Sequence, residues 1–192
     1  MRSASLPDER PEIAARLGTR CVALIGLMGA GKTTVGRRLA QLLDLPFRDT
    51  DTEIETAARM TVAELFAAYG EPEFRALEAR VVARLAQEGP QVLATGGGAY
   101  MAADTRAVLA EKAVTVWLKA DLDVLMDRVG RRTTRPLLDN ADPRGVMAAL
   151  IETRYPVYAE ADITILSRNV RREVIADEIA EALDRHLDRT GR

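Results

Sequence analysis

A glycine-rich run that ends in a lysine and two threonines has the clearest chemistry in the sequence. It reads Gly26-Leu27-Met28-Gly29-Ala30-Gly31-Lys32-Thr33-Thr34 and fits the pattern G-x-x-x-x-G-K-[ST]. Glycines let successive backbone N–H groups point at a polyanion, and a following helix adds the partial positive charge of its N-terminus. We therefore predict that residues 29–34 bind ATP, with Lys32 at the β- and γ-phosphates and the Thr33 hydroxyl as a ligand of Mg²⁺.

Two carboxylates could serve the acceptor of the phosphate. Asp49 and Asp51 directly follow the short segment 45–48, which we interpret as a strand. One acid could hold the water shell of a metal ion while the other accepts a hydrogen bond from the attacking hydroxyl. Alternatively, the pair could cap a helix that begins near residue 52. The guanine-reading pattern Asn-Lys-x-Asp does not occur in the sequence, which favours a kinase over a GTPase.

The elements that must position these residues alternate between strands and helices. Short apolar segments indicate strands at 21–26, 45–48, 91–94, 114–118 and 163–166, and amphipathic segments indicate helices at 33–43, 52–88, 103–111, 122–129, 144–158 and 170–187. Such alternation is typical of parallel strands with helices on both faces. We predict an α/β fold of three layers around a central five-stranded parallel sheet, with ligands beyond the carboxyl ends of the strands.

These elements fit one domain at residues 21–188. Residues 1–20 carry two prolines among charges and predict a flexible lead-in with at most one turn of helix, and residues 189–192 would form a short tail. The segment 130–143 is rich in Arg, Thr and Asp and lies between two predicted helices. A loop of this length is typical of a mobile lid, although a solvated linker would have the same composition.

Composition argues against several partners. A formal net charge of −2 offers no global attraction to nucleic acid or anionic lipid. The single cysteine, Cys21, cannot form an internal disulfide, and no stretch approaches the roughly 18 to 20 apolar residues of a membrane span. We expect a cytoplasmic monomer that binds neither nucleic acid nor membrane. Cys21 and Trp117 should be buried in strands, whereas the sole histidine, His186, should face solvent.

Four further motifs occur in order along the chain. They are Gly70-Glu71-Pro72-Glu73-Phe74-Arg75, Gly96-Gly97-Gly98, Arg135-Pro136-Leu137-Leu138 and Arg154-Tyr155-Pro156-Val157-Tyr158. With the glycine-rich run and Asp49-Thr50-Asp51, they resemble the shikimate kinase family from Cys21 to about Arg172. The resemblance implies a P-loop NTPase fold of the nucleoside monophosphate kinase type. It also implies that the γ-phosphate of ATP is transferred to the 3-hydroxyl of shikimate with Mg²⁺, on the pathway to chorismate and the aromatic amino acids.

The resemblance further implies roles for residues on the acceptor side, whose helical part would cover about 51–88. Asp51 would bind the substrate hydroxyls and act as base or orienting group, and Asp49 would hold Mg²⁺ through water. Gly97 and Gly98 would offer backbone N–H groups at the ring face, where a side chain would block close approach.

By the same resemblance, Arg75 and Arg154 would clamp the substrate carboxylate. A planar guanidinium matches a carboxylate at two points, which suits this task. Glu78, one helical turn beyond Arg75, would orient that arginine.

The resemblance assigns three more arginines to ATP. Arg135 would reach the transferring phosphate from the lid and act in catalysis together with Lys32 and Asp51. Arg128 would stack on adenine, and Arg171 would line the base pocket. At Glu173 the sequence departs from the family, which often has proline nearby.

Two alternatives remain open at this point. The first is another small-metabolite kinase of the same architecture, such as a gluconate kinase, from which the set of Arg75, Arg154 and Asp51 would distinguish this chain. The second is a regulatory nucleotide-binding module without turnover, against which the presence of Lys32, Asp51 and Arg135 argues.

Overall fold

The computed structural model of the 192-residue chain describes residues 10–130 and 141–190, and their strands form one sheet. The strands are β1 (Cys21–Ile25), β2 (Phe47–Asp49), β3 (Val92–Ala94), β4 (Ala113–Lys119) and β5 (Ile163–Leu166). Their order is β2-β3-β1-β4-β5, and every neighbouring pair is parallel. The predicted five-stranded parallel sheet is therefore confirmed.

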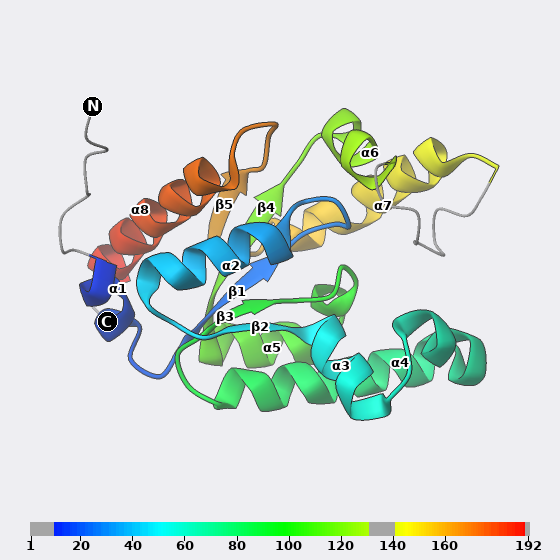
Figure 1. Cartoon of the computed structure of the whole chain (residues 1–192), viewed down its shortest axis with the longest axis horizontal. Helices are drawn as coiled ribbons and strands as arrows, with labels where there is room; N and C mark the ends of the chain where they lie inside the picture. Colours follow the sequence, from blue (N-terminus) through cyan, green and yellow to red (C-terminus); the bar gives the residue numbers. More distant parts are fainter. Residues whose placement is uncertain (1–9, 131–140, 191–192) are drawn as a thin grey trace.

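Helices cover both faces of the sheet, as the alternation of elements predicted (Figure 1). One face carries α1 (Arg10–Leu17), α2 (Lys32–Leu43) and α8 (Arg172–Thr190), and the other carries α4 (Val62–Gln87), α5 (Ala103–Lys112) and α7 (Pro143–Tyr158). The shorter elements α3 (Thr50–Ala58), α6 (Leu122–Gly130) and the 3-10 turn η1 (Ala99–Met101) lie toward the carboxyl ends of the strands. The molecule thus has the three layers of an α/β sandwich.

The central strand β1 is apolar because both of its faces and both of its edges are covered. All five of its residues are buried, and Val22 lies opposite Val92 of β3 on one side and Val114 of β4 on the other. Cys21 is fully buried at the start of this strand, and Trp117 of β4 is 4% exposed. Both burial predictions are confirmed, and the sheet is a rigid platform for the loops at its carboxyl edge.

Residues 10–17 differ from the predicted flexible lead-in. They form α1, whose Ile13 and Leu17 are buried in the main core. Arg16 of this helix makes ion pairs with Asp184 and Asp188 of α8. The expectation failed because two apolar side chains one turn apart are enough to dock a short helix on an existing core, even though no long periodic pattern marks it.

The predicted helical region 52–88 consists of two helices, α3 and α4, and the second is kinked. Gly70 has φ 79° and ψ 170°, a non-helical conformation inside α4, and Pro72 follows it. A left-handed φ suits glycine because no Cβ clashes with the backbone. The kink separates the beginning of α4 from the part that carries Phe74 and Arg75.

The predicted lid falls mainly outside the described residues. Its ends are the last residue of α6, Gly130, and the beginning of α7, where the Asp142 side chain accepts a hydrogen bond from the backbone N–H of Gly145. Arg135 lies outside the described residues, so its role stays a prediction. Among the helices within 10–130 and 141–190, none has the length and apolar character needed to cross a membrane.

Candidate active site

The glycine-rich run forms a tight loop between β1 and α2. Gly29 and Gly31 have φ of 82° and 95°, and Gly31 is the N-cap of α2. Such positive φ values are easy only for glycine, so these two residues allow the loop to curl around an anion at the helix N-terminus. Lys32 donates hydrogen bonds to the carbonyl oxygens of Gly26 (2.7 Å) and Leu27 (3.1 Å), which keeps its ammonium group along the loop.

Asp49 links this loop to the second strand. The Thr33 hydroxyl donates to Asp49 Oδ2 at 2.7 Å, and Asp49 Oδ1 accepts from the backbone N–H of Asp51 at 3.1 Å. Asp49 is thus the N-cap of α3, and the capping interpretation of the acidic pair holds for it. Capping does not compete with the contact to Thr33, because each interaction uses a different carboxylate oxygen.

The oxygen atoms of Thr33 and Asp49 are hard ligands of the type that Mg²⁺ prefers. Over the described residues, no group of three or more His, Cys, Asp or Glu side chains gathers as a metal cluster. A site with so few protein ligands fits Mg²⁺, which usually keeps several waters and binds substrate phosphates.

A run of three glycines after β3 lies between the phosphate loop and the acceptor side. A carbon atom added to Gly97 would lie 3.6 Å from Arg154 Nη1 and 3.7 Å from the backbone nitrogen of Met28 in the phosphate loop. A carbon added to Gly98 would lie only 2.6 Å from the guanidinium carbon of Arg75. The structure therefore brings Arg75 and Arg154 to neighbouring residues of one glycine loop.

Arg75 and Arg154 reach that loop from different helices. The guanidinium of Arg154, on α7, donates to the carbonyl oxygen of Gly97 at 3.0 Å. Arg75, on α4, donates to Glu78 Oε2 at 2.6 Å, and its guanidinium lies 5.3 Å from the ring centroid of Phe74. Two positive planar groups thus converge, which is the arrangement needed to bind a carboxylate.

Glu78 is buried beside this pair, with 2% of its side chain exposed. A carbon added to Gly96 would lie 2.2 Å from Glu78 Oε1 and 3.0 Å from Asp51 Oδ1, so both carboxylates face the same glycine. Glu78 Oε1 has no hydrogen-bond partner among the described residues. Burial raises the pKa of Glu78, although the nearby Arg75 charge acts in the opposite direction.

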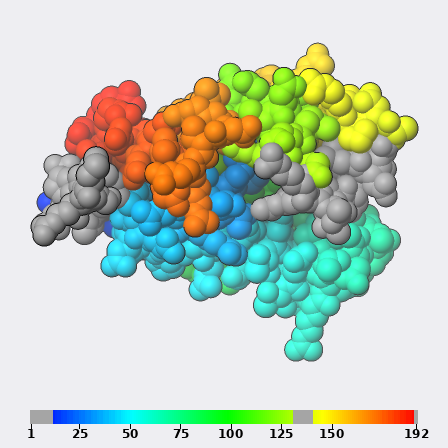
Figure 2. Space-filling model, turned by 45° about the horizontal axis from the view of Figure 1, so that its top comes forward, coloured from blue at the N-terminus to red at the C-terminus, as the bar shows by residue number. Residues whose placement is uncertain are grey.

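A cavity of about 480 Å³ opens on the other side of the phosphate loop. On the face drawn in Figure 2, the segment around 165–175 (orange), α6 (green) and the beginning of α2 (blue) meet around it. Its lining comprises Met28, Gly29, Gly31, Lys32, Thr33, Thr34, Val35, Arg128, Val129, Ser167, Arg168, Val170, Arg172 and Ile175. Its volume lies within the range of small-molecule sites.

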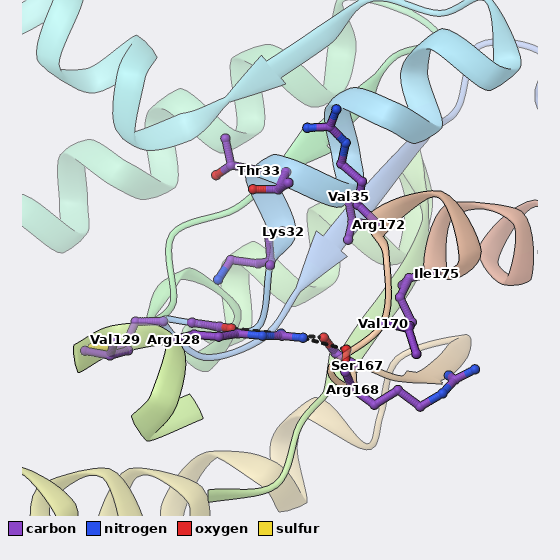
Figure 3. Close-up of a pocket in the computed structure, with 14 residues that line it drawn as sticks. Lys32, Thr33, Val35, Arg128, Val129, Ser167, Arg168, Val170, Arg172 and Ile175 are labelled. Atoms are coloured by element: carbon purple, nitrogen blue, oxygen red, sulfur yellow. Dashed lines mark hydrogen bonds between the residues drawn. The ribbon is translucent and has the colours of Figure 1, made fainter. Parts of the chain in front are cut away.

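Arg128 lies across this cavity below Lys32 (Figure 3). Its guanidinium donates to the carbonyl oxygens of Gly29 (3.1 Å) and Arg168 (2.7 Å). It also donates to the Ser167 hydroxyl at 2.8 Å. Burial lowers the pKa of Arg128, but a guanidinium stays charged in proteins. The planar group is therefore held flat, as a surface on which a ring could stack.

The contact predicted for Arg171 stays a prediction. Arg171 and Arg172 are both exposed, and of the two it is Arg172 that lies among the residues lining the cavity. The helix α8 begins at Arg172 instead of the predicted residue 170. Arg172 and Ile175 are three residues apart on that helix and therefore lie on one face.

Two site residues were missed in the sequence, Ser167 and Tyr158. Ser167 is 2% exposed, and its hydroxyl donates to the carbonyl oxygen of Ala30 at 2.7 Å. The Tyr158 hydroxyl donates to the carbonyl oxygen of Gly97. The only signal for Tyr158 was its position at the end of the motif that begins with Arg154, and Ser167 follows a strand whose carboxyl end lies at the site.

Comparisons with known proteins agree with this geometry. A model of the family described as "Shikimate kinase" matches residues 28–184. A shikimate kinase of Brucella canis is 57% identical over 188 residues, which are 98% of this chain and 94% of that protein.

Solved structures lead to the same family. The structure of shikimate kinase from Acinetobacter baumannii in complex with shikimate has a TM-score of 0.86 and 36% identity, and the match covers 90% of this chain and 97% of that one. A gluconokinase from Sinorhizobium meliloti has a TM-score of 0.60 at 19% identity, with 90% and 95% of the two chains covered, and shares the fold alone. The family match, the identity to curated relatives and the structural match coincide over most of the chain, which therefore belongs to the shikimate kinase family.

Proposed function

We propose that this chain transfers the γ-phosphate of ATP to the 3-hydroxyl of shikimate, giving shikimate 3-phosphate and ADP. The observation that carries the proposal is the convergence of Arg75, Arg154 and Asp51 on the glycine loop 96–98, one face of which adjoins the phosphate loop. A carboxylate-bearing acceptor and a triphosphate donor would meet there. The relative from Acinetobacter baumannii, solved in complex with shikimate, supports this choice of acceptor.

On the nucleotide side, the backbone of residues 29–34 would bind the phosphates of ATP. Lys32 would leave the carbonyl oxygens of Gly26 and Leu27 and neutralise charge on the γ-phosphate as it transfers. The flat guanidinium of Arg128 would stack against adenine in the cavity. Arg135, in the proposed lid, would add a second positive charge at the phosphate.

On the acceptor side, Arg75 and Arg154 would hold the carboxylate of shikimate. Asp51 would accept a hydrogen bond from the 3-hydroxyl and orient its oxygen toward the phosphorus. Gly97 and Gly98 can approach the ring closely because they carry no side chain. A hydroxy acid whose carboxylate binds the two arginines but whose hydroxyl points away from Asp51 would bind without being phosphorylated.

Thr33 and Asp49 would hold Mg²⁺, Thr33 directly and Asp49 through water. Bound Mg²⁺ would neutralise charge on the phosphate oxygens. We further propose that the enzyme works as a monomer in the cytoplasm, where ATP is supplied. Its product would enter the pathway to chorismate and the aromatic amino acids.

The test is steady-state turnover with ATP across a panel of hydroxy acids that includes shikimate and gluconate. We expect turnover of shikimate, and we expect Asp51→Asn to lower kcat by on the order of 10²–10⁴. Asp104→Asn, an exposed residue of α5, is the matched control and should behave like the parent. Turnover of gluconate without turnover of shikimate, or nucleotide binding without any phosphoryl transfer, would overturn the proposal.

A further inference from the structure

A run of three glycines has no side chains with which to fix its own shape. The loop 96–98 must therefore be held by groups that bind its backbone. The Thr50 hydroxyl accepts from the N–H of Gly96 at 2.9 Å, and the carbonyl oxygen of Gly97 accepts from both Arg154 Nη1 and the Tyr158 hydroxyl. Tyr158 thus contributes one of the few contacts that hold the loop.

The direction of the Gly97 carbonyl also determines the direction of the next N–H group. No peptide bond of the described chain is cis, so the Gly97 carbonyl and the Gly98 N–H lie in one plane and point in opposite directions. A donor that fixes the carbonyl of Gly97 fixes the direction of the Gly98 N–H at the same time. This N–H belongs to the residue against which the Arg75 guanidinium lies.

Tyr158 acts together with Arg154 at this carbonyl. The two residues are four positions apart on α7, so they lie on one face of the helix, and both donate to the carbonyl oxygen of Gly97. Loss of the Tyr158 hydroxyl would remove one of these two donors and leave the loop with fewer restraints.

The tyrosine ring has little freedom to move. Tyr158 is fully buried, and its ring centroid lies 6.1 Å from that of Trp117, 6.2 Å from that of Tyr155 and 6.4 Å from that of Tyr100. Burial also raises the pKa of Tyr158, so its hydroxyl keeps its proton and stays a donor at neutral pH. A rigid ring with a protonated hydroxyl is suited to hold a flexible loop.

We propose that Tyr158 is a positioning residue for the acceptor: its hydroxyl orients the Gly97–Gly98 peptide, to whose carbonyl oxygen Arg154 also donates, and so sets the affinity for the carboxylate-bearing substrate. The inference rests on the proposed function for the identity of that substrate. Tyr158 itself does not touch the reacting atoms.

Tyr155 supplies a matched control three residues away on the same helix. Its hydroxyl also donates to a backbone carbonyl oxygen, that of Ala120, and its ring also packs on Trp117, with centroids 4.9 Å apart. Tyr155→Phe and Tyr158→Phe each remove one hydroxyl from one partly buried hydrogen bond. The two variants should lower the melting temperature by similar amounts. They differ in the backbone carbonyl that loses its donor, which is that of Gly97 in Tyr158→Phe and that of Ala120 in Tyr155→Phe.

The experiment measures KM for shikimate and for ATP, kcat and the melting temperature in the parent, Tyr158→Phe and Tyr155→Phe. We expect Tyr158→Phe to raise KM for shikimate about tenfold, since one buried hydrogen bond of this kind changes affinity by up to about that factor. KM for ATP should stay within about twofold of the parent, and Tyr155→Phe should leave KM for shikimate unchanged. In ¹H–¹⁵N spectra, the Gly98 amide resonance should shift in Tyr158→Phe and not in Tyr155→Phe.

Equal changes of KM for shikimate in both variants, or an unshifted Gly98 resonance in Tyr158→Phe, would overturn the inference. A parent enzyme that does not phosphorylate shikimate would instead refute the proposed function. The same variants would then be compared with the acid that the parent does phosphorylate, and the Gly98 resonance decides the role of Tyr158 whichever acid that is.

Discussion

The two sides of the site are built in different ways. The phosphate-binding part of the nucleotide side comes from one uninterrupted run, residues 26–34, and its shape depends on backbone conformation and on carbonyl oxygens that fix Lys32 and Arg128. The acceptor side comes from positions 51, 75, 97–98 and 154, on separate elements, and depends on half-buried charged side chains and on the buried Glu78. The phosphate-binding part is therefore formed by a local motif, whereas the acceptor side forms only when the whole sheet has assembled.

This difference predicts which measured quantity each side controls. Changes on the nucleotide side should alter phosphoryl transfer or KM for ATP and leave shikimate binding intact. Changes on the acceptor side should alter KM for shikimate and, where charges are buried, also the stability of the fold.

The largest effect should come from Lys32→Met on the nucleotide side. Loss of its positive charge at the transferring phosphate should lower kcat by on the order of 10³, as for the removal of a key electrostatic group. Shikimate binding should persist, and it can be followed by the fluorescence of Trp117, the sole tryptophan, which packs on the helix that carries Arg154. Lys112→Met, a surface change, is the control. A parallel loss of shikimate binding in Lys32→Met would mean that the two sides are not separable.

Glu78→Gln should have the next largest effect, and it should affect substrate binding and fold stability in different ways. Arg75 would lose its charged partner at 2.6 Å, and KM for shikimate should rise about tenfold because the guanidinium is then less firmly held. Glu71→Gln is the matched control, since Glu71 also pairs with Arg75 but is mostly exposed. It should change KM for shikimate much less.

The same substitution should change how stability depends on pH. Burial raises the pKa of Glu78 in the folded protein above that of the unfolded chain, so the folded form holds the proton to higher pH. The stability of the parent should therefore fall as pH rises through the interval between those two pKa values. Glutamine does not ionise, so the melting temperature of Glu78→Gln relative to the parent should be higher at pH 8 than at pH 4. A relative melting temperature that falls with rising pH would contradict the burial argument.

The local and non-local sides also differ in how well the sequence predicted them. The phosphate loop, the five strands and the burial of Trp117 follow from local pattern alone, because each depends on residues within a few positions of one another. The convergence of Arg75 and Arg154 was available only through resemblance to a family, since nothing local says that α4 and α7 reach the same glycine loop. Tyr158 and Ser167 were missed because a lone hydroxyl carries no periodic signal.

The boundaries of elements were predicted less well than their existence. The helix α8 begins two residues later than predicted, at Arg172, which lines the cavity. Along α1 the signal was too short to read, although Ile13 and Leu17 are buried. In both cases packing against the rest of the molecule decided what local propensity left open.

The smallest predicted effect distinguishes Arg171 from Arg172 at the nucleotide cavity. Arg172 lines the nucleotide cavity, but its side chain is 58% exposed and pairs with Glu173 at 3.1 Å, so solvent screens much of its charge. Arg172→Ala should raise KM for ATP only about two- to threefold, and less at high salt, because an exposed charge contributes little. Arg171→Ala should leave KM for ATP at the parent value, and both variants should keep the parent's KM for shikimate. A larger effect of Arg171→Ala on KM for ATP would contradict this assignment. The contact implied by the family resemblance would then hold, and Arg171, in the loop before α8, would be the arginine at the adenine end of the cavity.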